Sequence, residues 1–455
     1  MSTLLAFVLT LAVLIVVHEY GHYRVARACG VKVLRFSVGF GRVLWRHQRS
    51  PDATEFTLCA LPLGGYVRML DEREGPVAPA ERAQAFNNRP LPQRVAIVAA
   101  GPLANLLLAV LLFAAALWVG AQEPRALLGA PLAGSLAERA GLQAGDLVQA
   151  SSPDGQDWQE LQSLSELREQ TLNALMAGRK LHLEVSDMRG HGRHSVVLDV
   201  DSLSGQEVDA ALLRKIGLGG AYGEPVIREL VAGGAGERAG LRPGDRVRAI
   251  DGRPVPDAAT LIERVRHAAQ GGEVQVQHWQ IERAGQDVEL DVQPKRVEEG
   301  GQVFGRIEAG VGSAPQTVLV RYDFAEGLWR GLQRTWELSS MSLRMFGRML
   351  IGEASLKNLS GPLSIADYAG QSARLGLSYY LGFLGAVSVS LGVLNLLPLP
   401  MLDGGHLMYY LFEGLSGRPV SEWWQRQLQR AGALILVLMM ALALSNDVAR
   451  YAGLH

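Results

Sequence analysis

The segment His18-Glu19-Tyr20-Gly21-His22 carries side chains whose types and spacing suit metal chemistry. On a helix, residues four apart lie on one face, so His18 and His22 can bind one zinc ion. Glu19 is then placed to act as a general base. A catalytic zinc also takes a third protein ligand and keeps one position open for water. The motif therefore predicts a hydrolytic metal site that still needs a ligand.

An uncharged and almost wholly apolar run, residues 2–17, comes directly before this motif. The run lacks a basic segment in front of it and a small-residue cleavage site behind it, so we expect it to be retained rather than removed as a signal peptide. Ionisable residues inside a membrane span are costly and usually mark function. The motif is therefore expected inside or at the edge of a bilayer.

The composition agrees with a membrane protein built from several parts. The chain has 455 residues, of which 48% are hydrophobic and 20% are charged, and this indicates apolar spans separated by polar domains. A net charge of −1 gives no sign of nucleic-acid binding, and the two cysteines, Cys29 and Cys59, suggest neither a disulfide framework nor a zinc finger.

Four segments are candidate transmembrane helices: residues 4–24, 95–122, 378–401 and 431–446. About 20 residues are needed to cross the hydrocarbon, so the second and third segments qualify easily, while the first and last are borderline. The loop between the first two segments has twelve Lys and Arg residues against six acidic residues. Such loops face the cytoplasm, so both termini and the region 123–377 are expected outside.

This orientation supplies a third metal ligand. The third segment runs from outside to inside and ends in a stretch that contains Asn395, Asp403 and His406. Asp403 is therefore expected at the same membrane face as His18 and His22. His406 is an alternative ligand, since histidine commonly binds zinc. Asp403 could instead cap the turn before Gly404 and Gly405.

The cytoplasmic loop contains an apolar, β-prone stretch, residues 56–70, that is broken by Gly64 and Gly65. It is too short to span a bilayer, and β structure at a membrane must be covered by protein or line a cavity. The stretch is either a β element that dips beside the active site or a plain soluble hairpin.

The external region contains an internal repeat. Residues 138–146 (ERAGLQAGD) reappear as residues 237–245 (ERAGLRPGD), at an offset of 237 − 138 = 99 residues, which is the size of a small domain. An alternating strand follows each Gly-Asp pair. The pattern resembles PDZ domains of bacterial proteases, which bind extended peptides and free C-termini. In the second copy, the glycine-rich stretch Ile216-Gly217-Leu218-Gly219 is either a carboxylate-binding loop or a linker.

The whole chain resembles the site-2 protease family of intramembrane zinc metalloproteases. The resemblance is carried by HEYGH at residues 18–22, GPLAN at residues 101–105, the external PDZ-like pair, and NLLPLPMLDGG at residues 395–405. It implies one zinc ion per chain, bound by His18, His22 and Asp403, with Glu19 as general base. It also implies that Asn395 and the re-entrant stretch around Gly64, Gly65 and Tyr66 hold the substrate strand.

The order of these parts is similar to that of family members which make the second cut in a single-span anti-sigma factor during envelope stress and clear remnant signal peptides. For this chain the resemblance implies a multi-pass protein of the bacterial inner membrane. Its termini and PDZ domains would be periplasmic, with the active site near the cytoplasmic face. The PDZ pair is expected to bind C-termini of pre-cleaved substrates and to exclude uncut ones.

The predicted fold is thus an α-helical polytopic membrane protein with four transmembrane helices, a membrane-associated β element and two external α+β PDZ domains resembling small β-barrels. The expected boundaries are 1–121 for the first two helices, with the β region at about 52–72; 122–207 and 208–297 for the PDZ domains; 298–377 for a membrane-proximal amphipathic region; and 378–455 for the last two helices. The alternative function is a non-catalytic PDZ scaffold, and a metal transporter is a weaker third.

Overall fold

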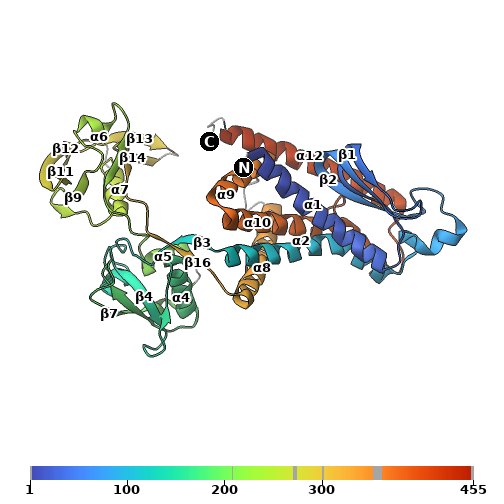
Figure 1. The fold of residues 1–455 in the computed structure, drawn as a ribbon, viewed down its shortest axis with the longest axis horizontal. Helices are drawn as coiled ribbons and strands as arrows, with labels where there is room; N and C mark the ends of the chain where they lie inside the picture. The colour runs from blue at the N-terminus through green and yellow to red at the C-terminus, as the bar shows by residue number, and fades with distance from the viewer. Residues whose placement is uncertain (1–2, 207–208, 270–273, 300–301, 352–360, 452–455) are drawn as a thin grey trace. The chain divides into compact units, whose positions relative to one another are not determined.

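The computed structural model describes residues 3–206, 209–269, 274–299, 302–351 and 361–451. The chain forms two compact units, which Figure 1 shows as a mainly helical part and a part rich in strands. The helical unit consists of Met1–Ala121 together with Arg321–His455, and the β-rich unit consists of Gln122–Val320.

The helical unit contains long helices, one β-hairpin and two short 3-10 turns. Its elements are α1 (Thr3–Ala28), β1 (Val33–His47), β2 (Glu55–Met69), η1 (Pro79–Gln84), η2 (Phe86–Asn88), α2 (Leu91–Val119), α8 (Phe324–Leu350), α9 (Pro362–Leu375), α10 (Leu377–Leu396), α11 (Asp403–Ser416) and α12 (Glu422–Tyr451).

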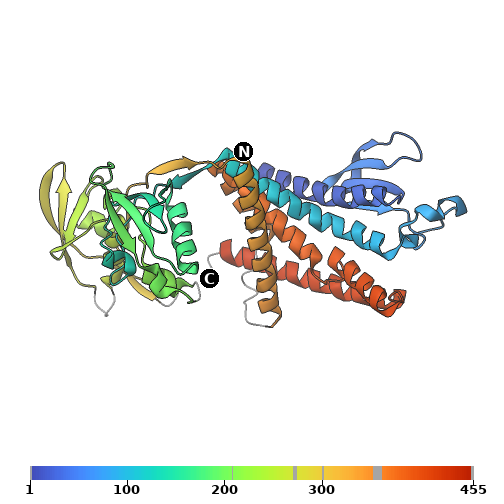
Figure 2. The same cartoon turned by 90° about the horizontal axis from the view of Figure 1, so that it is seen from below.

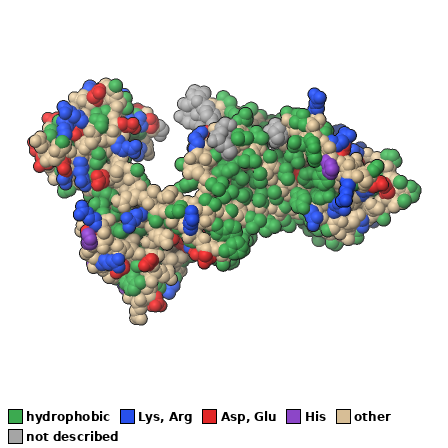
Figure 3. Space-filling model, viewed as in Figure 1, with side chains coloured by type: hydrophobic (Ala, Val, Ile, Leu, Met, Phe, Trp, Pro, Cys, Tyr) green, Lys and Arg blue, Asp and Glu red, His purple; other side chains and the backbone are tan. Residues whose placement is uncertain are grey.

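Four helices of the described chain are long and apolar enough to cross a membrane: α1, α2, α10 and, within α12, the segment Trp423–Val448. Each overlaps one of the four predicted spans. Figure 3 shows hydrophobic side chains gathered over the helical unit on the viewed face. Leu107 on α2 and Val437 on α12 are 62% and 65% exposed, which water would disfavour and lipid would not. The helical unit is therefore that of a polytopic membrane protein.

Helix α2 is the centre of the helical unit, because α1, α8 and α10 all pack against it (Figure 2). Small residues allow the close approach that membrane helices use. A Cβ added at Gly21 of α1 would lie 2.4 Å from the carbonyl oxygen of Ala100, and one at Gly331 of α8 would lie 2.6 Å from that of Val110. On the α10 side, the Ser388 hydroxyl donates a hydrogen bond to the Asn105 carbonyl at 2.7 Å.

The β-hairpin bends so that β2 lies on both sides of the first half of β1. Phe36 of β1 pairs with Phe56 at the beginning of β2 and with Val67 near its end. Residues 65–69 pair with β1 on one side, and no further strand of the described chain pairs with them on the other. The sequence predicted β structure over residues 56–70, but strand β1 was missed.

The β-rich unit contains fourteen strands and five short helices among the residues described, besides one 3-10 turn. Its elements are β3 (Ala121–Pro124, whose first residue belongs to the helical unit), α3 (Leu136–Arg139), β4 (Leu147–Ser152), β5 (Gln159–Glu160), α4 (Leu164–Met176), β6 (Leu181–Ser186), β7 (His194–Leu198), η3 (Val200–Leu203), α5 (Ala210–Ile216), β8 (Ile227–Leu230), α6 (Ala235–Arg238), β9 (Arg246–Ile250), β10 (Arg253–Pro254), α7 (Ala258–His267), β11 (Gln277–Arg283), β12 (Gln286–Val292), β13 (Lys295–Glu299), β14 (Gln302–Arg306), β15 (Ala309–Val311) and β16 (Thr317–Val320).

The two repeats found in the sequence begin equivalent four-stranded antiparallel sheets, with strand orders β5-β4-β6-β7 and β10-β9-β11-β12. The repeated Gly-Asp pair has the same structural role in both. Gly145 and Gly244 adopt φ values of 92° and 93°, which favour glycine. Asp146 and Asp245 each accept a hydrogen bond at 2.7 Å from the backbone N–H three residues before them. Each sheet has its own hydrophobic core.

The structure divides the external region differently from the expected boundaries. The boundary at residues 207 and 208 lies outside the described residues, but α5, which follows it, buries Leu212 and Ile216 in the first core. The region 298–377 is not one membrane-proximal segment, because Ile307 and Ala309 pack in or against the second core and the β-rich unit extends to Val320. The amphipathic helix α8 begins only at Phe324, and residues 352–360 lie outside the described chain.

Asp447 of α12 fixes the beginning of α9, a helix that the sequence did not reveal. This carboxylate is 1% exposed and accepts hydrogen bonds from the backbone N–H groups of Gly361, Leu363 and Ser364, at 2.9–3.1 Å, and from the Ser364 hydroxyl. The first N–H groups of a helix have no partner within the helix, so Asp447 supplies what α9 lacks.

We expect Asp447→Ala to lower the melting temperature of the detergent-solubilised protein, because each buried donor left unpaired costs about 1–3 kcal/mol. Asp447→Asn keeps one acceptor oxygen and should lose less. An Asp447→Ala protein that melts at the wild-type temperature would contradict this role.

Candidate active site

Three potential metal ligands from distant parts of the sequence meet in the helical unit. His18 and His22 lie one turn apart on α1, and Asp403 is the first residue of α11. The two Nε2 atoms are 3.2 Å apart, and Oδ2 of Asp403 lies 3.2 Å from Nε2 of His18 and 3.5 Å from Nε2 of His22. In the part of the chain that the structure describes, this is the single cluster of three or more residues with such ligand atoms.

A hydrogen bond on the side of the His22 ring away from the cluster shows which ring nitrogen carries the proton. Nδ1 of His22 lies 2.8 Å from the carbonyl oxygen of Ile97, which can only accept, so Nδ1 carries the proton. Nε2 of the neutral His22 ring then has no proton, and its lone pair faces Nε2 of His18 and Oδ2 of Asp403. With the proton of His18 also on Nδ1, the three facing atoms are all acceptors, and they repel one another unless a cation lies among them.

The separations agree with a zinc ion. Zinc bonds to histidine nitrogen and carboxylate oxygen are about 2.0–2.2 Å long, so ligand atoms of a tetrahedral site are about 3.3 Å apart. The three measured separations, 3.2, 3.2 and 3.5 Å, lie close to that value. Two imidazoles and one carboxylate are also a donor set that catalytic zinc sites use, with the fourth position left for water.

Two glycines allow helix α2 to reach the metal-binding motif. Gly21, within the motif, removes the side chain that would collide with Ala100. A Cβ at Gly101 would lie 2.2 Å from Nε2 of His22, the atom that faces the other two ligands. The Gly21 and Gly101 positions are therefore set by the closeness of the two helices at the site.

A cavity of about 370 Å³ opens beside the cluster. His18, Glu19, His22 and Asp403 all line it, so the predicted general base shares one cavity with the three predicted ligands. His406 also lines the cavity but is not a member of the ligand cluster.

Asp71 and Arg73 add charged groups to the lining of the same cavity. Burial disfavours ionisation of Asp71, but hydrogen bonds from the backbone and side chain of Arg73 hold the pKa of this carboxyl below its ordinary value. Asp71 therefore stays ionised and paired at neutral pH. The sequence did not predict Asp71 or Arg73 as part of the site, because both lie in a loop whose path depends on the fold.

The hairpin brings its second strand to the general base. Gly65, Tyr66 and Val67 line the cavity. A Cβ at Gly65 would lie 3.0 Å from Cγ of Glu19 and 2.9 Å from the carbonyl oxygen of Ser37, so a larger residue would push the strand away. The neighbouring Gly64 lies against the ring of Phe40. Asn395 lies in the last turn of α10 and, among the described residues, is not part of the cavity lining.

The glycine-rich stretch at residues 216–219 belongs to the first core, not to the second copy as expected. Ile216 ends α5 and is buried in that core, Gly217 forms the left-handed cap of α5, and Leu218 packs against the same core. Gly219 has no room for a side chain, because its Cβ would lie 2.2 Å from the carbonyl oxygen of Gly129. The repeat offset misplaced this stretch because α5 folds back onto the domain before it.

Residues 6–439 match the sequence profile of peptidase family M50. The chain belongs to this family of site-2 proteases. It is a metalloendopeptidase, and the intramembrane protease role is the one this family supports. The chain is 37% identical over 456 residues to the regulator of sigma-E protease RseP of Escherichia coli K12 and 36% identical over 461 residues to protease RseP of Yersinia pestis, with 98% of each chain covered. It is 44% identical over 467 residues, covering all of both chains, to a Ralstonia nicotianae protein named as a zinc metalloprotease.

We expect Gly101→Ala to weaken zinc binding by roughly 10-fold or more, because the added methyl group displaces the ring of the ligand His22, and losing even a group that only orients a ligand typically costs this much. Zinc affinity would be measured by competition with a chelator in detergent micelles. Gly382→Ala, on the membrane helix α10, is the matched control, since a Cβ at Gly382 would meet nothing within 4 Å. Equal affinities for the two variants would contradict the close packing at His22.

Proposed function

We propose that this M50 peptidase is a zinc protease of the bacterial inner membrane that cleaves the transmembrane segments of single-span membrane proteins. The observation that carries the proposal is the convergence of His18, His22 and Asp403, with Glu19, on one cavity between apolar helices. One zinc ion per chain is the proposed cofactor. A non-catalytic scaffold would have no need of a complete ligand set or of Glu19.

The residues of the cavity have separate chemical roles in this proposal. A bound zinc ion supplies a Lewis acid and lowers the pKa of water toward neutrality. Glu19 takes one proton from the water whose oxygen attacks the scissile carbonyl carbon. It then gives that proton to the leaving nitrogen as the C–N bond breaks. Ile97 holds the proton on Nδ1 of His22 throughout, so Nε2 stays available to the metal.

A transmembrane substrate must lose its helical hydrogen bonds before this chemistry, because its amide groups are otherwise paired within the helix. The edge of β2 at residues 65–69, with which no further strand of the described chain pairs, supports a way to hold the extended segment, since strand edges bind added strands through backbone hydrogen bonds. Gly65 and Tyr66 would pair with the substrate beside Glu19. Asn395, at the end of α10, is proposed to hold the same strand.

The excess of Lys and Arg in the loop between α1 and α2 supports a cytoplasmic position for this end of the helical unit. The termini and the β-rich unit would then be periplasmic. We propose an anti-sigma factor as one substrate and remnant signal peptides as another; relatives named as regulators of sigma-E protease support a link to sigma-factor control.

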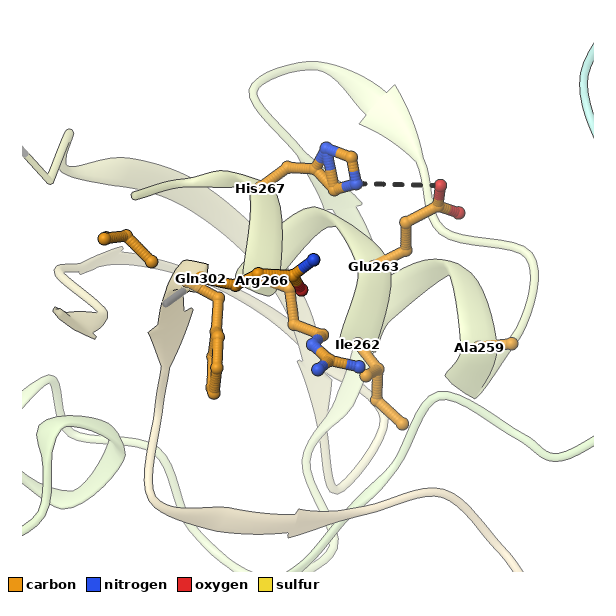
Figure 4. Close-up of a pocket in the computed structure, with 8 residues that line it drawn as sticks. Ala259, Ile262, Glu263, Arg266, His267 and Gln302 are labelled. Carbon is orange, nitrogen blue, oxygen red and sulfur yellow. Dashed lines mark ion pairs between the residues drawn. The ribbon is translucent and has the colours of Figure 1, made fainter. Parts of the chain in front are cut away.

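We also propose that the β-rich unit is a pair of PDZ domains and that the second domain binds peptide C-termini. Two hollows of the second domain support this proposal. One hollow, of about 740 Å³, lies between α7 and β14, and Figure 4 shows Ile262, Arg266 and Gln302 around it. A second hollow extends the first along β15, which pairs with β8 alone among the described strands. An apolar floor, an arginine and an unpaired strand edge suit an extended peptide with a free carboxylate.

Glu19→Gln should keep zinc affinity and lower cleavage of a single-span substrate by at least about 100-fold, since a general base typically contributes that much. The measurement is cleavage in proteoliposomes together with zinc content. His18→Ala is the control that should lose zinc. Unchanged cleavage by Glu19→Gln would contradict the proposed mechanism.

Ile262→Asp should weaken binding of a peptide with an apolar residue and a free carboxylate at its C-terminus by roughly 10-fold or more, because it places a like charge in the groove. Fluorescence anisotropy on the full chain in detergent measures this. Val231→Asp, at another exposed β-branched apolar residue of the same domain, is the matched control. Equal binding of the C-terminally amidated peptide would contradict carboxylate recognition.

A further inference from the structure

Asn105 lies inside α2, next to the metal-binding motif, and its side chain is not explained by the roles assigned above. It is 1% exposed, in a helix that is apolar enough to cross a membrane. Its amide nitrogen Nδ2 lies 3.4 Å from Nδ1 of His18. Its amide oxygen Oδ1 is buried and faces no hydrogen-bond donor in the described structure. A buried amide is costly unless it is paired, so its contact with His18 needs a reason.

With Nδ2 of Asn105 toward His18, the amide conflicts with metal binding by His18. A neutral imidazole carries one proton. If Nδ2 of Asn105 donates to Nδ1 of His18, that proton must lie on Nε2, the atom 3.2 Å from Oδ2 of Asp403. Nε2 would then have no lone pair for the metal. Amide nitrogen and oxygen are distinguished only by their hydrogen bonds. A rotation of the amide by 180° therefore keeps the shape of the side chain and exchanges the atom that faces His18.

We infer that Asn105 is a positioning residue whose Oδ1 accepts the Nδ1–H of His18 and so leaves Nε2 free for the metal. The rotated amide gives Oδ1 the donor that it lacks and puts the His18 proton on Nδ1, as Ile97 does for His22. Metal-bound histidines commonly donate their second N–H to a carbonyl or carboxylate in this way. The inference rests on the metal site proposed above.

The spacing along α2 supports this role. Ile97, Gly101 and Asn105 recur every four residues and so share one face of the helix. The Ile97 carbonyl accepts from His22, Gly101 leaves room for the His22 ring, and Asn105 reaches His18. Because α1 and α2 pack closely, this one face orients both imidazoles. An amide is a suitable acceptor here because it carries no charge, whereas a carboxylate would add a second buried negative charge beside Asp403.

Zinc affinity of the full chain in detergent micelles, measured by chelator competition, tests the inference. Asn105→Leu, which keeps the volume but removes the acceptor, should weaken zinc binding by roughly 10- to 100-fold. Asn105→Asp, which keeps an acceptor, should stay within about 10-fold of wild type. Asn105→Ala also lacks the acceptor and replaces the leucine variant if that variant does not fold. The same 10- to 100-fold loss of zinc affinity is expected. The melting temperature of the zinc-free protein reports folding separately.

Ser388→Ala is the matched control, because Ser388 bonds to the backbone oxygen of Asn105 and not to its amide, so zinc affinity should stay at the wild-type level. His18→Ala distinguishes a failure of the Asn105 role from a failure of the proposed metal site. If His18→Ala loses zinc while the leucine and alanine variants of Asn105 bind it as wild type does, the inference on Asn105 is overturned and the metal site stands. If His18→Ala binds zinc normally, the proposed site itself is overturned.

Discussion

The repulsion among three electron-rich atoms governs the organisation of the helical unit. Nε2 of His18, Nε2 of His22 and Oδ2 of Asp403 lie within 3.5 Å of one another, and once both neutral imidazoles carry their protons on Nδ1 only a cation makes that favourable. The fold must therefore hold them together against their own repulsion. It does so from two helices, with a third helix behind them that fixes where the protons lie.

Helix α2 is that third helix, and its sequence shows how an apolar segment can serve a polar site. The backbone carbonyl of Ile97 accepts a hydrogen bond from the His22 ring, and the absent side chain at Gly101 leaves room for that ring, so His22 is oriented without a polar side chain from α2. The β-hairpin makes a similar use of glycine, since Gly65 lets a strand edge pass beside Glu19. A site built in this way stays largely apolar, which suits a membrane, and still offers hydrogen bonds to the two imidazoles and, in our proposal, to the substrate.

Much of the site could be predicted from the sequence because its signals are local or depend on charge. The spacing of His18 and His22 fixed their common helix face, and the Lys and Arg asymmetry placed Asp403 at the same membrane face almost 400 residues away. The contacts of α2 could not be predicted, because Ile97 acts through its backbone and Asn105 matters only once α1 packs on α2. Strand β1 was missed although Phe36, Val38 and Phe40 alternate with Arg35, Ser37 and Gly39, a period of two that indicates a strand. The groove beside α7 was missed because its second wall, β14, lies beyond the aligned repeat.

X-ray absorption at the zinc edge of the purified full-length protein tests the central claim most directly, because it identifies the ligand atoms themselves. The account predicts one zinc ion per chain bound by two imidazole nitrogens and by oxygen, with no sulfur. It also predicts that Asp403→Asn changes the oxygen shell or releases the metal. A shell with sulfur from Cys29 or Cys59, or a third imidazole such as His406 in place of the carboxylate, would contradict it.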